Sequence, residues 1–203
     1  MNPLTLTGQI FGFCAMALII LSFQFRDNRR LFMLQIGSCL FFTLNFLFLG
    51  LGGDASAYSG MAQNLLGLVF RAVIVLGGRF RKLNSPVTMS VIAAAMAALA
   101  VFTYSGNPVS LLPVVGNFLC LGGMWTGDAN VIRAVQLAAV SPAWLTYNIF
   151  LFSIAGILVE SFNIVSIIVY YIRAHMAKKK EAGKENDESK NRNAGRVEGK
   201  QLH

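Results

Sequence analysis

Amide side chains placed inside long apolar stretches are the residues of this chain best suited to bind a solute. Eight lie there: Gln35, Asn45, Gln63, Asn64, Asn117, Gln136, Asn148 and Asn163. An amide in hydrocarbon must find hydrogen-bond partners, so these side chains are expected to face the interior of a helix bundle. There each one either binds a polar solute or joins two helices, and both interpretations stay open.

Two of these amides, Asn64 and Asn163, are predicted to bind the solute, because an internal repeat places them at matching positions. Six further residues are secondary candidates: Gln24, Asn45, Gln63, Arg71, Asn117 and Asn148. Among these, Arg71 is the charge clearly inside an apolar stretch. It lies five residues before Leu76, about 7–8 Å from the predicted cytoplasmic end at 1.5 Å per residue. Its side chain is expected to snorkel to that end, and the alternative is an anion-binding or gating role.

Catalytic and metal-binding patterns are missing from the sequence. It contains no HExxH, no P-loop, no GxSxG and no paired catalytic carboxylates. The cysteines lie in apolar runs without metal-ligand spacing, so neither an enzyme nor a cofactor is predicted. The acidic residues Asp27, Asp54, Asp128 and Glu160 are assigned to loops or to the ends of apolar runs. A proton relay then lacks a carrier, and facilitated diffusion is expected rather than proton coupling.

The composition indicates a membrane protein. Hydrophobic residues make up 55% of the chain, charged residues only 13%, and the mean hydropathy is +0.59. A water-soluble domain could not cover its surface with so few charges. The net charge of +8 does not require a nucleic-acid partner, because the basic residues gather at the ends of apolar runs, as membrane topology predicts. The predicted partner is the lipid bilayer.

Seven transmembrane helices are predicted, each near the length of about 20 residues that crosses the hydrocarbon core. An all-α fold is expected because helices satisfy their own backbone hydrogen bonds in lipid. The spans are Leu6–Phe25, Leu31–Gly50, Ala57–Leu76, Val87–Tyr104, Leu111–Thr126, Val131–Phe152 and Ala155–Ile172.

The basic residues predict the orientation of these helices. Lys and Arg residues lie in the loops after the first and third spans and at the end of the seventh, and Arg133 follows the loop after the fifth, whereas the alternate loops carry none. The basic side is cytoplasmic, so the N-terminus is expected in the periplasm and the C-terminus in the cytoplasm. Residues 177–203 are charged and poor in apolar residues, and are predicted to form a disordered cytoplasmic tail.

An internal repeat organises the spans. The segment DNRRLFMLQ (27–35) matches DANVIRAVQ (128–136), and the alignment of 60–71 with 159–170 sets Asn64 opposite Asn163. Three helices in residues 1–84 and three in 107–176 are joined by a linker helix in residues 85–106. Because the linker restores the direction of the chain, this 3+1+3 layout predicts parallel repeats.

Residues 8–50, GQIFGFCAMALIILSFQFRDNRRLFMLQIGSCLFFTLNFLFLG, resemble the YgjV-type bacterial inner-membrane proteins. The 3+1+3 layout resembles the PQ-loop superfamily, which includes the SWEET sugar facilitators. This second resemblance implies an amide on the third helix of each repeat facing a central solute, and Asn64 and Asn163 match those places. The Pro-Gln pair of the superfamily is Phe23-Gln24 here and Met124-Trp125 in the second repeat.

The missing prolines remove hinges that the resemblance associates with transport. Two functions therefore stay open: a facilitative transporter of an unknown small polar solute, and a receptor or scaffold of the same fold that moves nothing. The Gly8-x-x-x-Gly12 pattern in the first span predicts close helix packing, either within the chain or across a homodimer.

Overall fold

The computed structural model describes residues 2–22, 28–77, 85–126 and 128–201. Within these residues the chain is helical and contains no strand, as an all-α fold requires. The chain divides into two compact units, Met1–Ile164 and Val165–His203. All the residues of the candidate site belong to the first unit.

Seven continuous helical segments match the seven predicted spans within the described residues. The first four are α1 (Pro3–Ser22), α2 (Asn28–Leu51), α3 (Ala57–Gly77) and α4 (Pro86–Phe102). A short 3₁₀ turn, η2 (Pro108–Leu111), leads into α5 (Leu112–Trp125). The sixth segment joins α6 (Ala129–Val135), a π-helical stretch η3 (Gln136–Val140) and α7 (Ser141–Phe150), and α8 (Ile154–Gln201) is the seventh.

In the part of the chain that the structure describes, three segments are long and apolar enough to cross a membrane by length and composition: Pro3–Ser22, Met33–Leu51 and Ile154–Ala177. Two shorter apolar helical stretches, Pro86–Phe102 and Pro108–Gly123, accompany them. The α-helix of the fifth segment begins at Leu112, one residue after the predicted start of the span, and Pro113 stands in its first turn, where proline is well tolerated.

Several amide and hydroxyl side chains are buried, while many large apolar side chains lie on the outside. Asn45 and Gln63 are fully buried, together with several serines. Large apolar side chains face outward instead, with Val101 77% exposed and Phe102 84% exposed. A bundle in lipid favours this arrangement, because amides find partners inside it and apolar groups meet hydrocarbon outside.

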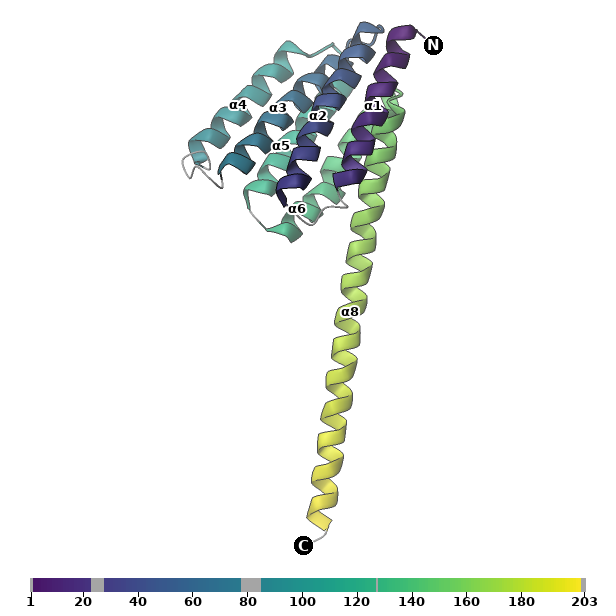
Figure 1. Cartoon of the computed structure of the whole chain (residues 1–203). Helices are drawn as coiled ribbons and strands as arrows, with labels where there is room; N and C mark the ends of the chain where they lie inside the picture. The colour runs from purple at the N-terminus through teal and green to yellow at the C-terminus, as the bar shows by residue number, and fades with distance from the viewer. Residues whose placement is uncertain (1, 23–27, 78–84, 127, 202–203) are drawn as a thin grey trace. The chain divides into compact units, whose positions relative to one another are not determined.

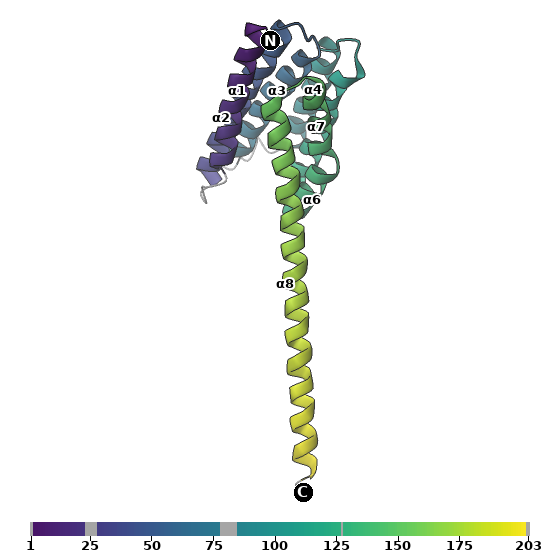
Figure 2. The same ribbon diagram turned by 90° about the vertical axis from the view of Figure 1, so that its right-hand side faces the viewer.

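Helices α1, α2 and α3 pack side by side in chain order, and two views of the ribbon agree on this (Figures 1 and 2). The buried residues of α1 are Gly8, Gln9, Gly12, Ala15 and Ser22, so its inner face is small or polar. A Cβ atom at Gly12 would lie 3.0 Å from both Asn45 Nδ2 and the Cβ of Ala155. The predicted close packing of the GxxxG pattern is therefore present within the chain.

Aromatic side chains fill the apolar core between the first helices and α7. Phe46 on α2 lies 6.1 Å from Trp144 and 5.5 Å from Tyr147 on α7, ring centre to ring centre. A second cluster joins α4 to α5 through Ile92, Met96 and Leu121.

The charged segment after Ala177 differs from its sequence-based description. Disorder is predicted for residues 177–203, whereas α8 continues as a helix to Gln201. A charged composition poor in apolar residues means that the segment cannot build a hydrophobic core of its own. Its helix propensity is nevertheless high, because the segment lacks proline and is rich in Ala, Lys, Glu and Arg, which are good helix formers.

Candidate functional site

Asn45 joins three parts of the bundle. Its Nδ2 donates to the carbonyl oxygen of Gly8 on α1 at 2.7 Å, and its Oδ1 accepts from the hydroxyl of Ser153 at 3.2 Å. The side chain is 0% exposed. Its hydrogen bonds thus connect α1, α2 and the corner before α8, and this secondary candidate fits the helix-joining interpretation.

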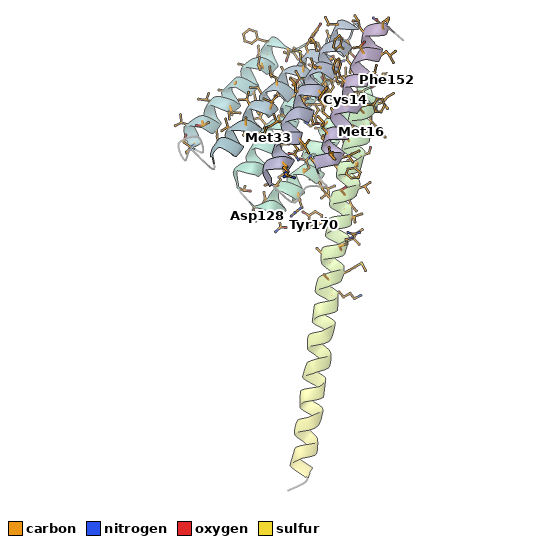
Figure 3. The ribbon with its side chains drawn as sticks, in the orientation of Figure 1. Cys14, Met16, Met33, Asp128, Phe152 and Tyr170 are labelled. Carbon is orange, nitrogen blue, oxygen red and sulfur yellow. The ribbon has the colours of Figure 1, made fainter. Side chains whose placement is uncertain are left out.

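Gln9, which sequence reasoning did not single out, holds that same corner. Its Nε2 donates to the carbonyl oxygen of Phe152 at 2.7 Å, and its Oε1 accepts from the backbone N–H of Ile154 at 3.1 Å. Phe152 has a φ of 51°, a left-handed conformation that is strained for a bulky residue. Figure 3 places Phe152 at the end of the bundle where α1 begins and Asp128 at the opposite end.

Gln63 and Asn117 join α3, α4 and α5. Asn117 Nδ2 donates to the backbone oxygen of Gln63 at 2.8 Å and to its Oε1 at 3.3 Å. Gln63 Nε2 donates to the backbone oxygen of Met96 at 3.3 Å. These two secondary candidates also serve as links between helices.

Tyr147 of α7 inserts its hydroxyl group into the first turn of α3. The hydroxyl accepts from the N–H of Gly60 at 2.8 Å and donates to the carbonyl oxygen of Ser56 at 2.8 Å. Residues 56 and 60 are four apart, the spacing of a direct helical hydrogen bond. A Cβ at Gly60 would lie 2.5 Å from the hydroxyl oxygen, so glycine is needed there for this insertion.

Asn64, one of the two predicted solute-binding amides, lies one turn further along α3 and is half-buried. Its Nδ2 donates to the carbonyl oxygen of Gly60 at 3.0 Å, within its own helix. That bond uses one of the two donors of the amide. The solute-binding role of Asn64 stays a prediction.

Arg71 does not snorkel to the predicted cytoplasmic end of α3. Its Nη1 donates to the carbonyl oxygen of Gly67 at 3.2 Å, one turn toward the start of the helix. Helical side chains lean toward the N-terminal end of their own helix, and the guanidinium group follows this tendency. Gly67 is the middle residue of α3 (57–77), so the charge lies beside the midpoint of the helix.

The predicted placement of the acidic residues in loops or at the ends of apolar runs is wrong for Glu160. It was assigned to the end of a span, but it lies six residues inside the apolar stretch Ile154–Ala177, about 9 Å along the helix axis. Two neighbours hydrogen-bond its carboxyl group: the hydroxyl of Ser141 and the amide of Asn163, whose Nδ2 lies 3.4 Å from Oε2. Arg71 is close enough to attract the carboxylate electrostatically.

The π-helical stretch η3 shapes the neighbourhood of Glu160. Gln136 Nε2 donates to Ser141 Oγ at 3.0 Å across five positions of the chain. A wider π turn aligns residues five apart on one face, and such turns are frequent at functional sites. Pro142, the second residue of α7, cannot donate a backbone hydrogen bond, which favours the irregular turn before it.

The residues Arg71, Gln136, Ser141, Glu160 and Asn163 form what we call the charged centre. They come from α3, η3, α7 and α8, and Cys120 of α5 lies within electrostatic range of both Arg71 and Glu160. Sequence reasoning named Arg71 and Asn163 but missed Ser141 and Glu160. The signal available for Glu160 was its position six residues inside an apolar run.

Two buried side-chain atoms lack a hydrogen-bond partner among the described residues: Arg71 Nε and Asn148 Oδ1. Both belong to predicted secondary candidates. Asn148 Nδ2 donates to the carbonyl oxygen of Trp144 at 2.8 Å within α7. Unmet hydrogen-bonding capacity in a bundle interior is what a polar ligand could use.

Other features contribute nothing to this centre. An open hollow of about 450 Å³ lies between α4 and α5, and it is lined by Pro86, Met89, Ser90, Ala93, Phe118, Leu121 and Gly122. This lining contains none of the candidate amides. The described residues hold no group of three or more His, Cys, Asp or Glu side chains placed to bind a metal. Gln24 lies outside the described residues.

A family model named Imp-YgjV, described as bacterial inner membrane protein, matches residues 6–178. The chain belongs to the Imp-YgjV family. Its place is therefore the bacterial inner membrane, in agreement with its apolar helices. Neither the curated proteins nor the solved structures contain a match to the chain. In this Imp-YgjV chain the matched region runs from the first turn of α1 through the rest of the first unit and includes the charged centre.

Proposed function

We propose that this protein moves a small polar solute across the inner membrane, through a site between two three-helix repeats. The carrying observation is the charged centre. Ionisable residues inside membrane segments are costly, and they commonly mark substrate or ion pathways. Arg71 and Glu160 are such residues: Ser141 of α7 hydrogen-bonds Glu160, and Arg71 of α3 attracts it electrostatically.

The proposal includes the 3+1+3 repeat of the PQ-loop and SWEET-like proteins, with the N-terminus periplasmic and the C-terminus cytoplasmic. Seven helical segments support this layout. The proposed solute-binding amides are Asn64 and Asn163. Asn163 belongs to the charged centre through its hydrogen bond to Glu160, and Asn64 lies on α3 seven residues before Arg71.

Facilitated diffusion was predicted because no carboxyl group was expected inside the membrane. The position of Glu160 removes that reason. The proposal therefore concerns the passage of the solute, driven by its own gradient or by a coupled ion.

Uptake into proteoliposomes tests the proposal with a panel of sugars, amino acids and organic acids. We expect flux of at least one class, and its loss in Asn64→Ala and in Asn163→Ala. Thr146→Ala is the matched control, because Thr146 is an exposed polar residue on α7. Absence of flux across the whole panel, with protein that is folded and inserted, would refute the transport proposal.

A receptor or scaffold of the same fold is the second candidate. Hydrogen bonds that fix helices to each other favour it, since Asn45, Gln63 and Asn117 are all used in this way. This function predicts binding of a ligand or protein partner with no flux in the same assay. A homodimer stays a prediction, as does the absence of enzymatic activity.

A further inference from the structure

Glu160 is an ionisable residue inside an apolar helical segment, Ile154–Ala177. It lies about 9 Å along α8 from Ile154, inside a 24-residue segment that is apolar enough to span the membrane. A charged carboxylate at such depth needs partners or a proton. The surroundings of Glu160 therefore determine which form it takes.

Each helix around Glu160 contributes a different kind of group. Arg71 on α3 supplies a positive charge, Ser141 on α7 a hydroxyl and Asn163 on α8 an amide, while Cys120 on α5 supplies a thiol within electrostatic range. Cys39 on α2 interacts in turn with Cys120. Arg71 is therefore the positive charge that acts on the carboxylate within the described residues.

The attraction between Arg71 and Glu160 acts without a direct ion pair. The hydrogen bond of Arg71 goes to a backbone oxygen, that of Gly67, and its Nε has no partner among the described residues. A direct, bidentate pair would add charge-assisted hydrogen bonds that favour the ionised carboxylate. Arg71 contributes its electrostatic attraction without those bonds.

The hydrogen bonds of Glu160 can persist in both of its forms. A hydroxyl group both donates and accepts, so Ser141 can donate to a carboxylate and accept from a carboxylic acid. Ser141 Oγ already accepts from Gln136 Nε2 at 3.0 Å, which leaves its own hydrogen for Glu160 and one lone pair. Asn163 donates to Oε2 in either form.

We propose that Glu160 is an intramembrane proton-binding site, and that proton binding there releases Arg71 from its position beside Gly67. A hydronium ion donates the proton: one of its O–H bonds breaks, one O–H bond forms on the carboxylate oxygen, and a neutral water molecule leaves. In the ionised form, opposite charges hold the guanidinium toward Glu160. In the protonated form the attraction is lost, and Arg71 turns toward Gly77, six residues further along α3, where its charge can reach water.

If the protein transports a solute as proposed above, proton binding at Glu160 would drive that transport. This coupling, but not proton binding itself, rests on the proposed function. Proton binding itself needs no solute and can be measured separately. Hydrophobic carbodiimides react with protonated carboxyl groups in apolar surroundings and leave an adduct that peptide mass mapping locates. The purified full chain in lipid vesicles is treated at about pH 6 and about pH 9, which bracket the range over which interior carboxyl groups titrate.

We expect an adduct on Glu160 at the lower pH and several-fold less at the higher pH. Asp54 and Asp128, which are exposed and lie outside the membrane-spanning segments, should stay unlabelled at both pH values. In Arg71→Gln the labelling of Glu160 should persist at the higher pH, because the charge that favours the ionised form is gone. Glu160→Gln should lose the adduct.

Three results would overturn the proposal: no adduct on Glu160 at either pH, equal labelling at both, or an unchanged pH dependence in Arg71→Gln. The first two of these results would be seen with the wild-type chain alone. The proposal can therefore be overturned even if the variants fail to fold. A protein that binds protons in this way but shows no flux would contradict only the transport proposal.

Discussion

The guanidinium group of Arg71 lies 3.2 Å from the carbonyl oxygen of Gly67, the middle residue of α3. The positive charge thus lies beside the middle of α3, close enough to attract the carboxylate of Glu160 on α8. An arginine that only anchored the helix end would extend toward water. This relationship makes the charged centre the most informative part of the molecule.

Asn45→Ala should destabilise the bundle. The change leaves the carbonyl oxygen of Gly8 and the hydroxyl of Ser153 without their partner. Interhelical hydrogen bonds in membranes contribute about 0.6–1.7 kcal/mol each, so the free energy of unfolding should fall by about 1–3 kcal/mol in a detergent titration. Thr43→Ala is the control, because Thr43 bonds within its own helix. Equal effects of the two changes would contradict this role for Asn45.

Tyr147→Phe should loosen the contact between α7 and the start of α3. The N–H of Gly60 and the carbonyl oxygen of Ser56 lose the hydroxyl that joins them. We expect a loss of about 1–2 kcal/mol in unfolding free energy. Tyr104→Phe, at a side chain that is 49% exposed, should change stability little. A Tyr147→Phe variant as stable as the wild type would show that the inserted hydroxyl contributes nothing.

Replacing Gly12 or Gly122 by alanine should have opposite effects on the stability of the protein. A Cβ at Gly12 would lie 3.0 Å from Asn45 and from Ala155, whereas Gly122 has nothing within 4 Å. Gly12→Ala should lower the melting temperature, because α1 must move away from α2 and α8. Gly122→Ala should be neutral or stabilising by about 0.4–1 kcal/mol. The reverse order would mean that α1 packs elsewhere in the membrane.

Reporter fusions measure the proposed orientation. Arg30 at the start of α2 and Arg133 in α6 belong to the side that should be cytoplasmic. Green fluorescent protein fused after His203 should therefore fluoresce in cells, and alkaline phosphatase at the same position should be inactive. Active phosphatase with a dark fluorescent fusion would place the C-terminus in the periplasm.

The helices themselves were predictable from the sequence, because apolar length and basic loops depend on local composition. Seven spans were expected and seven helical segments are present in the described residues. The roles of individual amides were not predictable. Asn45 and Asn64 are the same residue type in similar stretches, yet one joins helices and the other bonds within its own helix. The packing of distant segments decides this difference.

The charged centre was predicted only in part, for the same reason. Arg71 and Asn163 stood out as polar groups in apolar runs, but the electrostatic partner of Arg71 is Glu160, 89 positions later in the chain. Gln9 and Tyr147 act through backbone groups at a helix corner and a helix start. Their partners are backbone groups, which nearly every residue carries, so the sequence does not indicate where such hydrogen bonds form.

The central claim is that the polar interior contains a site for a moving solute in addition to links between helices. Solute uptake and melting temperature, measured together for Asn163→Ala and Asn45→Ala, test it most directly. We expect Asn163→Ala to abolish uptake with little change in melting temperature, and Asn45→Ala to lower the melting temperature. An Asn163→Ala variant that keeps wild-type uptake, or one that loses stability as Asn45→Ala does, would contradict the claim.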